Sequence, residues 1–243
     1  MNKNNFNYFT YSKNIISSLL FIFPFILLYE GISFFYFRNV SYQIRNSADV
    51  ILRNFFQIFG DFWHQAYTIT LIVAFLVIYF INKDLKAKNL VEFKFLIIML
   101  FEGLLYGILL FFLLNNIDFI STNVTLYQSG LLLNLYLSIG AGIWEEILFR
   151  LIIFSSLYKL LKSYIDIDFY PLFLSVIISS IIFSLFHYIG ESSYAFDIYS
   201  FTIRFIGGVF LSLLYNFRGF GIVSMAHISY DFILISLPLI YIN

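Results

Sequence analysis

Ionisable side chains interrupt the apolar segments of this chain at positions where a charge is costly. In the segment Trp144–Arg150, two adjacent carboxylates, Glu145 and Glu146, precede Arg150. Glu146 and Arg150 are four residues apart, so on a helix they share a face and can form an ion pair. Glu145 lies about 100° further around the helix, which leaves its carboxylate free to bind a water molecule or a metal ion. The surplus negative charge predicts a functional role for Glu145 and a structural role for the pair.

Two of the three histidines of the chain lie in later apolar segments. His187 follows Phe183 in the pattern Phe-x-x-x-His. His227 precedes Asp231 by four residues, so these two share a helix face. A single histidine in a membrane is often explained by a hydrogen bond between helices. Two histidines and an aspartate together with a buried glutamate, however, supply the ingredients of a water-activating site.

The same side chains also suit a metal ion. Glu145, His187 and His227 could bind Zn²⁺ as two histidines and one carboxylate, with a fourth position open for water. Without a metal, a glutamate in apolar surroundings can act as the base near neutral pH. The sequence leaves both versions open: no cofactor for a glutamate base, or Zn²⁺ for a metalloprotease.

Taken in order, these motifs resemble those of the CPBP family of intramembrane proteases. That family includes the CAAX prenyl endopeptidases and the bacteriocin-immunity, abortive-infection-type proteins. The patterns Glu-Glu-x-x-x-Arg, Phe-x-x-x-His and His-x-x-x-Asn/Asp fall between about residues 140 and 232, within a catalytic core of about 131–242. At the last position the chain has Asp231 where the prenyl endopeptidases have Asn. An anion is a poorer stabiliser of an oxyanion unless it is protonated.

The resemblance implies a hydrolase that cleaves a peptide bond of a membrane-associated or lipidated protein or peptide. It assigns the activation of water to Glu145 and His187, and the stabilisation of the tetrahedral oxyanion to His227 and Asp231. The implied partners are that substrate and the lipid bilayer. The alternative function is a non-catalytic bacteriocin-immunity or scaffold membrane protein on the same fold, because a fold does not fix a function.

The composition indicates which elements must position these residues. Of the 243 residues, 61% are hydrophobic and 12% are charged, about half the charged share of soluble domains. So few polar residues cannot cover a water-facing surface, which excludes a soluble enzyme. Lys+Arg 14 balance Asp+Glu 14, so the chain lacks the basic field expected of a nucleic-acid binder. With no cysteine, thiolate metal sites and cysteine nucleophiles are excluded as well.

The apolar segments predict an all-α, polytopic transmembrane helix bundle. A helix needs roughly 20 mostly apolar residues to cross a bilayer. Apolar residues at helical spacing in Val50–Phe59 also predict a short helix lying in the membrane interface. We expect one membrane domain, 1–243, with about seven spans (six to eight). The predicted spans are Asn14–Phe37, Phe62–Ile81, Phe95–Leu114, Leu131–Leu157, Leu172–Tyr188, Ile198–Tyr215 and Phe220–Ile242.

Lysine and arginine gather in alternate loops, which predicts an orientation. The loops rich in these cations are Asn82–Lys94 and Tyr158–Pro171, with Arg218 after the sixth span, and those without them are Asn115–Gly130 and Ile189–Asp197. By the positive-inside rule, the N-terminus lies in the cytoplasm and the C-terminus outside. The loop after the first span is an exception, because Arg38, Arg45 and Arg53 would lie outside.

Several further charges and one histidine have structural interpretations. Glu30 and Glu102 each precede a glycine in an apolar span, which indicates a hydrogen bond between helices or the lining of a cavity. Arg204 follows Asp197 by seven residues and is expected to pair with it. His64, beside Trp63, is expected to anchor the chain at the membrane interface.

The depth of the predicted site sets a condition on the fifth span. Glu145 lies near the middle of its span, whereas His187 lies near the end of its own. For the two side chains to share one site, the fifth helix is expected to continue beyond Tyr188, towards Tyr194.

Overall fold

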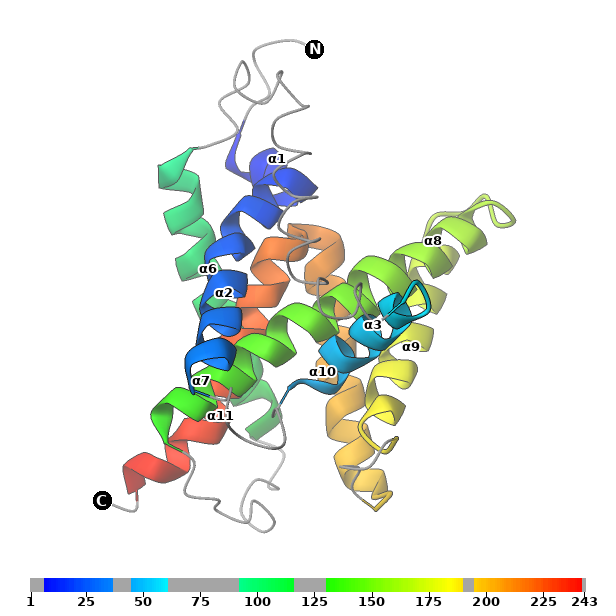
Figure 1. Ribbon diagram of the computed structural model, residues 1–243. Coiled ribbons are helices and arrows are strands. Elements are labelled where there is room, and N and C mark those ends of the chain that lie inside the picture. The colour runs from blue at the N-terminus through cyan, green and yellow to red at the C-terminus, as the bar shows by residue number, and fades with distance from the viewer. Residues whose placement is uncertain (1–6, 37–44, 61–91, 116–129, 190–194, 242–243) are drawn as a thin grey trace.

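The structure is a computed structural model that describes residues 7–36, 45–60, 92–115, 130–189 and 195–241. In these ranges all regular elements are helices and there is no strand, which confirms the all-α prediction. The helices (Figure 1) are α1 (Tyr8–Lys13), α2 (Ile15–Tyr36), α3 (Ser47–Gln57), α6 (Phe93–Asn115), α7 (Leu131–Gly140), η2 (Ala141–Glu145), η3 (Ile147–Phe154), α8 (Ser155–Lys162), α9 (Phe169–Phe186), α10 (Ile198–Arg218) and α11 (Phe220–Tyr241).

Five of the described helices are long and apolar enough to cross a membrane: α2, α6, α9, α10 and α11. Each coincides with a predicted span to within a few residues, and the chain is a multi-pass membrane protein. The predicted span Phe62–Ile81, with His64, lies outside the described residues. The predicted span Leu131–Leu157 is helical from end to end. It is divided among α7, η2, η3 and α8, each of which is too short to count alone.

Helix α11 lies at the centre of the described bundle. Of its apolar stretch 61% is buried, against 28–39% in the other four spanning helices. It packs against α2, α6, α7, η2 and α10. Small residues allow this close approach. A Cβ atom on Gly107 of α6, for example, would lie 2.5 Å from the carbonyl oxygen of Ala226 in α11. Polar side chains on α11 are therefore held inside protein rather than against lipid.

The helix that carries the two glutamates crosses the bundle as one long rod from α7 to α8 (green in Figure 1). Residues 141–145 and 147–154 are π-helical, so their amides bond to carbonyls five residues earlier. The expectation of a regular turn of 3.6 residues around Glu145 was therefore wrong. Apolar periodicity does not report which carbonyl each amide bonds to. Such π-turns are rare and often lie at functional sites.

Helix α9 ends earlier than the depth argument required. Its last residue is Phe186, and His187 is the first residue after it. The expected continuation towards Tyr194 is therefore wrong. The next two helices, α10 and α11, are joined by Gly219 alone, whose φ of 86° lies in the region that glycine adopts without strain. This sharp connection brings the start of α11 back into the bundle, beside α10.

Candidate active site

A buried ion pair holds one of the two histidines. Arg150 Nη1 lies 3.0 Å from Glu146 Oε1, as the spacing of four residues predicts, and both side chains are fully buried. The same Glu146 oxygen accepts a hydrogen bond of 2.7 Å from Nδ1 of His227. Arg150 also donates to the carbonyl of Gly208 in α10. The pair of Glu146 and Arg150 thus links three helices. The contact of Glu146 with His227, which orients the imidazole, was not indicated by the sequence.

The two carboxylate oxygens of the other glutamate, Glu145, differ in their described hydrogen-bond partners. Glu145 Oε1 accepts a 2.8 Å hydrogen bond from the side-chain amide of Asn46. Glu145 Oε2 is buried and accepts no hydrogen bond from the described residues. It lies 4.0 Å from Nε2 of His227, and Asp231 Oδ2 lies 3.6 Å from that nitrogen. Three of the four predicted catalytic side chains therefore meet around Nε2 of His227.

The fourth predicted residue, His187, reaches the same region through a shared aromatic ring. The Phe183 ring lies 5.1 Å from the His187 imidazole and 6.0 Å from that of His227, measured between centroids. The Arg150 guanidinium covers the same ring at 4.5 Å. The Phe-x-x-x-His motif therefore places its phenylalanine between the two histidines.

The partners of the two histidines give them different hydrogen-bonding roles. His187 Nδ1 lies 2.9 Å from the carbonyl oxygen of Phe183. A carbonyl can only accept, so Nδ1 carries the proton and Nε2 of the neutral ring is an acceptor. His227 Nδ1 likewise donates to the carboxylate of Glu146. Its Nε2, however, faces two carboxylate oxygens, which favours a proton on that nitrogen too. His187 is suited to accept a proton, and His227 to donate hydrogen bonds.

A glycine allows the glutamates to approach α11 so closely. Gly142 of η2 packs on α11, and a Cβ atom there would lie 2.6 Å from the backbone nitrogen of Ile228 and 2.8 Å from the carbonyl oxygen of Ser224. Backbone atoms inside a helix cannot move aside. The close contact one turn before Glu145 and Glu146 is what brings both carboxylates within reach of His227, the residue before Ile228.

The side chains that the sequence suggested for Zn²⁺ were Glu145, His187 and His227. Among the residues that the structure describes, no group of three or more His, Asp or Glu side chains is arranged to hold a metal ion. In the described geometry Glu145 Oε2 and His227 Nε2 lie 4.0 Å apart.

Two other intramembrane glutamates form ion pairs between elements. Glu102 of α6 pairs with Arg218 at 2.5 Å and accepts a hydrogen bond from Tyr8. Glu30 of α2 pairs with Arg45 at 3.2 Å and with Arg53 at 2.6 Å. The interhelical interpretation of both glutamates is confirmed. Carboxylates thus neutralise Arg45 and Arg53. These two arginines therefore argue less strongly against the predicted orientation than unpaired cations would.

The structure also shows the partners of Arg204 and the bounds of the helix predicted at the membrane interface. Arg204 donates to the hydroxyl of Tyr188 and to that of Ser200, whereas Asp197 caps α10 by accepting from the Ser200 amide at 2.7 Å. The helix predicted over Val50–Phe59 is α3, which begins three residues earlier.

The sequence did not single out Asn46. Its position before Ser47 and an amphipathic stretch is typical of a helix N-cap, and that signal could have located the start of α3. The contact with Glu145, 99 residues away, could not be predicted from the residues that surround either position in the sequence.

A family model matches the part of the chain that carries the three motifs. Residues 127–233 match the family described as Type II CAAX prenyl endopeptidase Rce1-like. This match confirms the resemblance to the CPBP and CAAX protease family and supports intramembrane endopeptidase activity in general. A search of curated proteins and a search of solved structures found no match.

Proposed function

We infer from the family match of residues 127–233 that the chain is an intramembrane endopeptidase of the CAAX type. Its substrate is a membrane-associated or lipidated protein or peptide, and its nucleophile is a water molecule. The observation that carries this proposal is the set of distances around His227. Glu146 holds one nitrogen at 2.7 Å, while Glu145 and Asp231 flank the other at 4.0 and 3.6 Å.

Water activation falls to Glu145 and His187. Glu145 Oε2 is the carboxylate oxygen that no described donor occupies, so it can accept a proton from water. Nε2 of His187 is the acceptor nitrogen of its ring and can hold the second hydrogen of the same water. Two acceptors orient the water and raise its nucleophilicity as it attacks the carbonyl carbon.

Stabilisation of the oxyanion falls to His227, supported by Asp231. Attack on the carbonyl moves an electron pair onto its oxygen, and an N–H on Nε2 of His227 stabilises that charge. Asp231 contributes an O–H donor in its protonated form and otherwise orients the imidazole. Glu145 then returns its proton to the leaving nitrogen, so that one peptide bond and one water give a carboxyl group and an amine.

The arrangement favours an enzyme over a non-catalytic immunity or scaffold protein. A scaffold has no need of buried ionisable groups, which cost several kcal/mol each in a membrane, roughly +2.5–3.5 on insertion scales. An ion pair alone would satisfy Glu146 and Arg150. One buried oxygen of Glu145 has no described donor. A water molecule that reacts at this oxygen would explain why the carboxylate is kept there.

The orientation follows from the cations. Lys159 and Lys162, in the last turn of α8, lie in the cytoplasm by the positive-inside rule, and the loop before α10 lies outside. The N-terminus is then cytoplasmic.

Cleavage of a defined peptide tests the proposal. The purified protein, in liposomes, would be given an internally quenched peptide with a farnesylated C-terminal Cys-a-a-X sequence, and the same peptide without the lipid. We expect cleavage of the lipidated peptide, identified by product mass, that persists in EDTA. Activity lost in the chelator and restored by Zn²⁺ would instead identify a metalloprotease. No cleavage of either peptide, or of other membrane-bound candidates, would support the scaffold alternative.

A further inference from the structure

Asn46 makes three contacts that join the start of α3 to the predicted site. Its side-chain Nδ2 donates to Glu145 Oε1 at 2.8 Å. Its Oδ1 accepts from the backbone amide of Ala48 at 2.9 Å. Its own backbone amide donates to the hydroxyl of Tyr29 at 3.3 Å. One residue thus caps α3, contacts α2 and bonds the glutamate that we assign as the base.

The helix cap determines which end of the amide faces Glu145. The Ala48 N–H can only donate, so it takes the oxygen of the Asn46 amide. The NH₂ group is then the part turned towards Glu145. Asn46 therefore presents a neutral donor to one carboxylate oxygen, and it cannot turn its amide over without losing the cap, which contributes about 1 kcal/mol.

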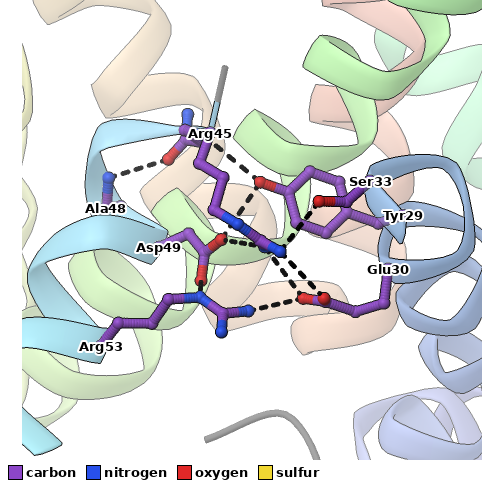
Figure 2. Close-up of polar contacts among 8 residues, drawn as sticks. Tyr29, Glu30, Ser33, Arg45, Ala48, Asp49 and Arg53 are labelled. Carbon is purple, nitrogen blue, oxygen red and sulfur yellow. Dashed lines mark hydrogen bonds and ion pairs between the residues drawn. The ribbon is translucent and has the colours of Figure 1, made fainter. Parts of the chain in front are cut away.

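A network of buried charges fixes the position of Asn46. Arg45, the preceding residue, reaches Glu30 at 3.2 Å and Asp49 at 2.9 Å. Arg53 reaches Asp49 at 2.8 Å and Glu30 at 2.6 Å. Figure 2 shows the two guanidinium groups and two carboxylates in one cluster between α2 and α3. Although burial disfavours the charge, Glu30 and Asp49 raise the pKa of Arg45 above its usual value. The charges balance, so the cluster ties the start of α3 to α2.

Aromatic packing ties the same region to the helix of Glu145. Tyr29, the partner of the Asn46 amide, stacks on Tyr136 of α7 at 4.5 Å and meets Trp144 of η2 at 6.2 Å. Gly140 leaves the necessary space. A Cβ atom there would lie 2.8 Å from the Tyr29 ring and 3.2 Å from Cβ of Asn46.

We propose that Asn46 is a positioning residue for Glu145. By occupying Oε1 it fixes the carboxylate so that Oε2 is the oxygen turned towards His227 and the reacting water. This inference rests on the proposed function and adds to it a residue outside 127–233, the range of the family match. The ion-pair cluster of Glu30, Arg45, Asp49 and Arg53 holds Asn46 in place.

Variants that keep the cap but change the donor test the proposal. Asn46→Ser and Asn46→Asp retain good N-cap residues. Serine lacks the amide donor, and aspartate replaces it with a second acceptor facing Glu145. We expect kcat for the lipidated peptide to fall about 10- to 100-fold in Asn46→Ser, and further in Asn46→Asp, with KM unchanged. Asn46→Ala removes the cap as well and should show a larger fall in the midpoint of thermal unfolding than Asn46→Ser.

A spectroscopic measurement tests the contact without substrate. The chain has six glutamates, so the carboxylate stretch of Glu145 in protein labelled with ¹³C-glutamate can be assigned by its loss in Glu145→Gln. We expect that band to shift in Asn46→Ser. An unshifted band, or wild-type kcat in both the Ser and the Asp variant, would overturn the positioning role while leaving the proposed function intact. A wild type that cleaves nothing would overturn the proposed function, and with it the catalytic meaning of Asn46.

Discussion

At the scale of single residues, the two histidines and the two glutamates differ in their hydrogen-bond partners, and these partners give each side chain a different role. His187 and His227 both donate from Nδ1, one to a backbone carbonyl and the other to a carboxylate. Glu145 and Glu146 are neighbours, yet Arg150 pairs with Glu146, and an amide bonds Glu145. These partners leave Glu145 Oε2 and His187 Nε2 as acceptors and give His227 Nε2 the role of donor.

The first residue-level prediction concerns His227. In His227→Leu the imidazole donor is lost and no other donor replaces it, and removal of one oxyanion donor typically lowers kcat about 10²- to 10³-fold. We expect a loss of that size with little change in KM, measured with the lipidated peptide. A loss confined to KM would place His227 in substrate binding instead.

The second concerns the buried ion pair. Arg150→Ala removes the guanidinium from the fully buried Glu146 and leaves His227 as its described partner, and breaking a buried ion pair costs about 3–5 kcal/mol. We expect a marked drop in the midpoint of thermal unfolding or in yield. Lys162→Ala is the matched control, because its pair with Asp168 is exposed and worth at most about 1 kcal/mol. Equal stability of the two variants would argue against the structural role of Arg150.

At the scale of elements, the π-helical turns and the contact of η2 with α11 set the position of the glutamates. The prediction here is that Gly142→Ala forces η2 away from α11. Overpacking of this kind costs about 1–3 kcal/mol of folding stability. We expect the folded Gly142→Ala protein to cleave the lipidated peptide more slowly than the wild type, because both glutamates are displaced from His227. Gly31→Ala is the control, since Gly31 lies within α2 and has open space around it. Wild-type activity of Gly142→Ala would contradict the argument from close packing.

The sequence predicted some elements well and others poorly, for physical reasons. The boundaries of α2 and α6 follow from the length of apolar segments, and both were predicted to within two residues. The pairing of Glu146 with Arg150 follows from helical spacing. The π-turns depend on which carbonyl each backbone amide bonds to, which apolar periodicity does not report. Helix α9 ends at Phe186, two residues before the predicted end at Tyr188. The link from Glu146 to His227, 81 residues apart, depends on how α11 packs.

At the scale of the whole molecule, a central helix surrounded by apolar helices lowers the free-energy cost of placing polar side chains within a membrane, because those side chains face protein rather than lipid. The most buried of the described spanning helices, α11, carries His227 and Asp231. The helix with Glu145 packs on one side of it, and α10 lies beside both α9 and α11. Through Asn46, the N-terminal part of the chain reaches the same site. Motifs in order along a sequence can therefore indicate the chemistry, but the full set of supporting residues emerges only from the packing.

The whole-molecule prediction concerns orientation. The chain has no cysteine, so single-cysteine variants report unambiguously. We expect a membrane-impermeant maleimide to label Ala195→Cys in intact cells, and Ser163→Cys only after the membrane is permeabilised. Both positions are exposed. The reverse pattern would contradict an N-terminus in the cytoplasm.

The most direct test of the proposed chemistry replaces one carboxylate by an amide. Glu145→Gln keeps the shape of the side chain but cannot accept a proton from water. Asp166→Asn makes the same chemical change at an exposed position outside the site. In single-turnover cleavage of the lipidated peptide by folded protein, we predict wild-type rates for Asp166→Asn and a loss of at least about 10²-fold for Glu145→Gln, the lower range of general-base catalysis. Equal rates for the two variants would show that Glu145 is not the catalytic base.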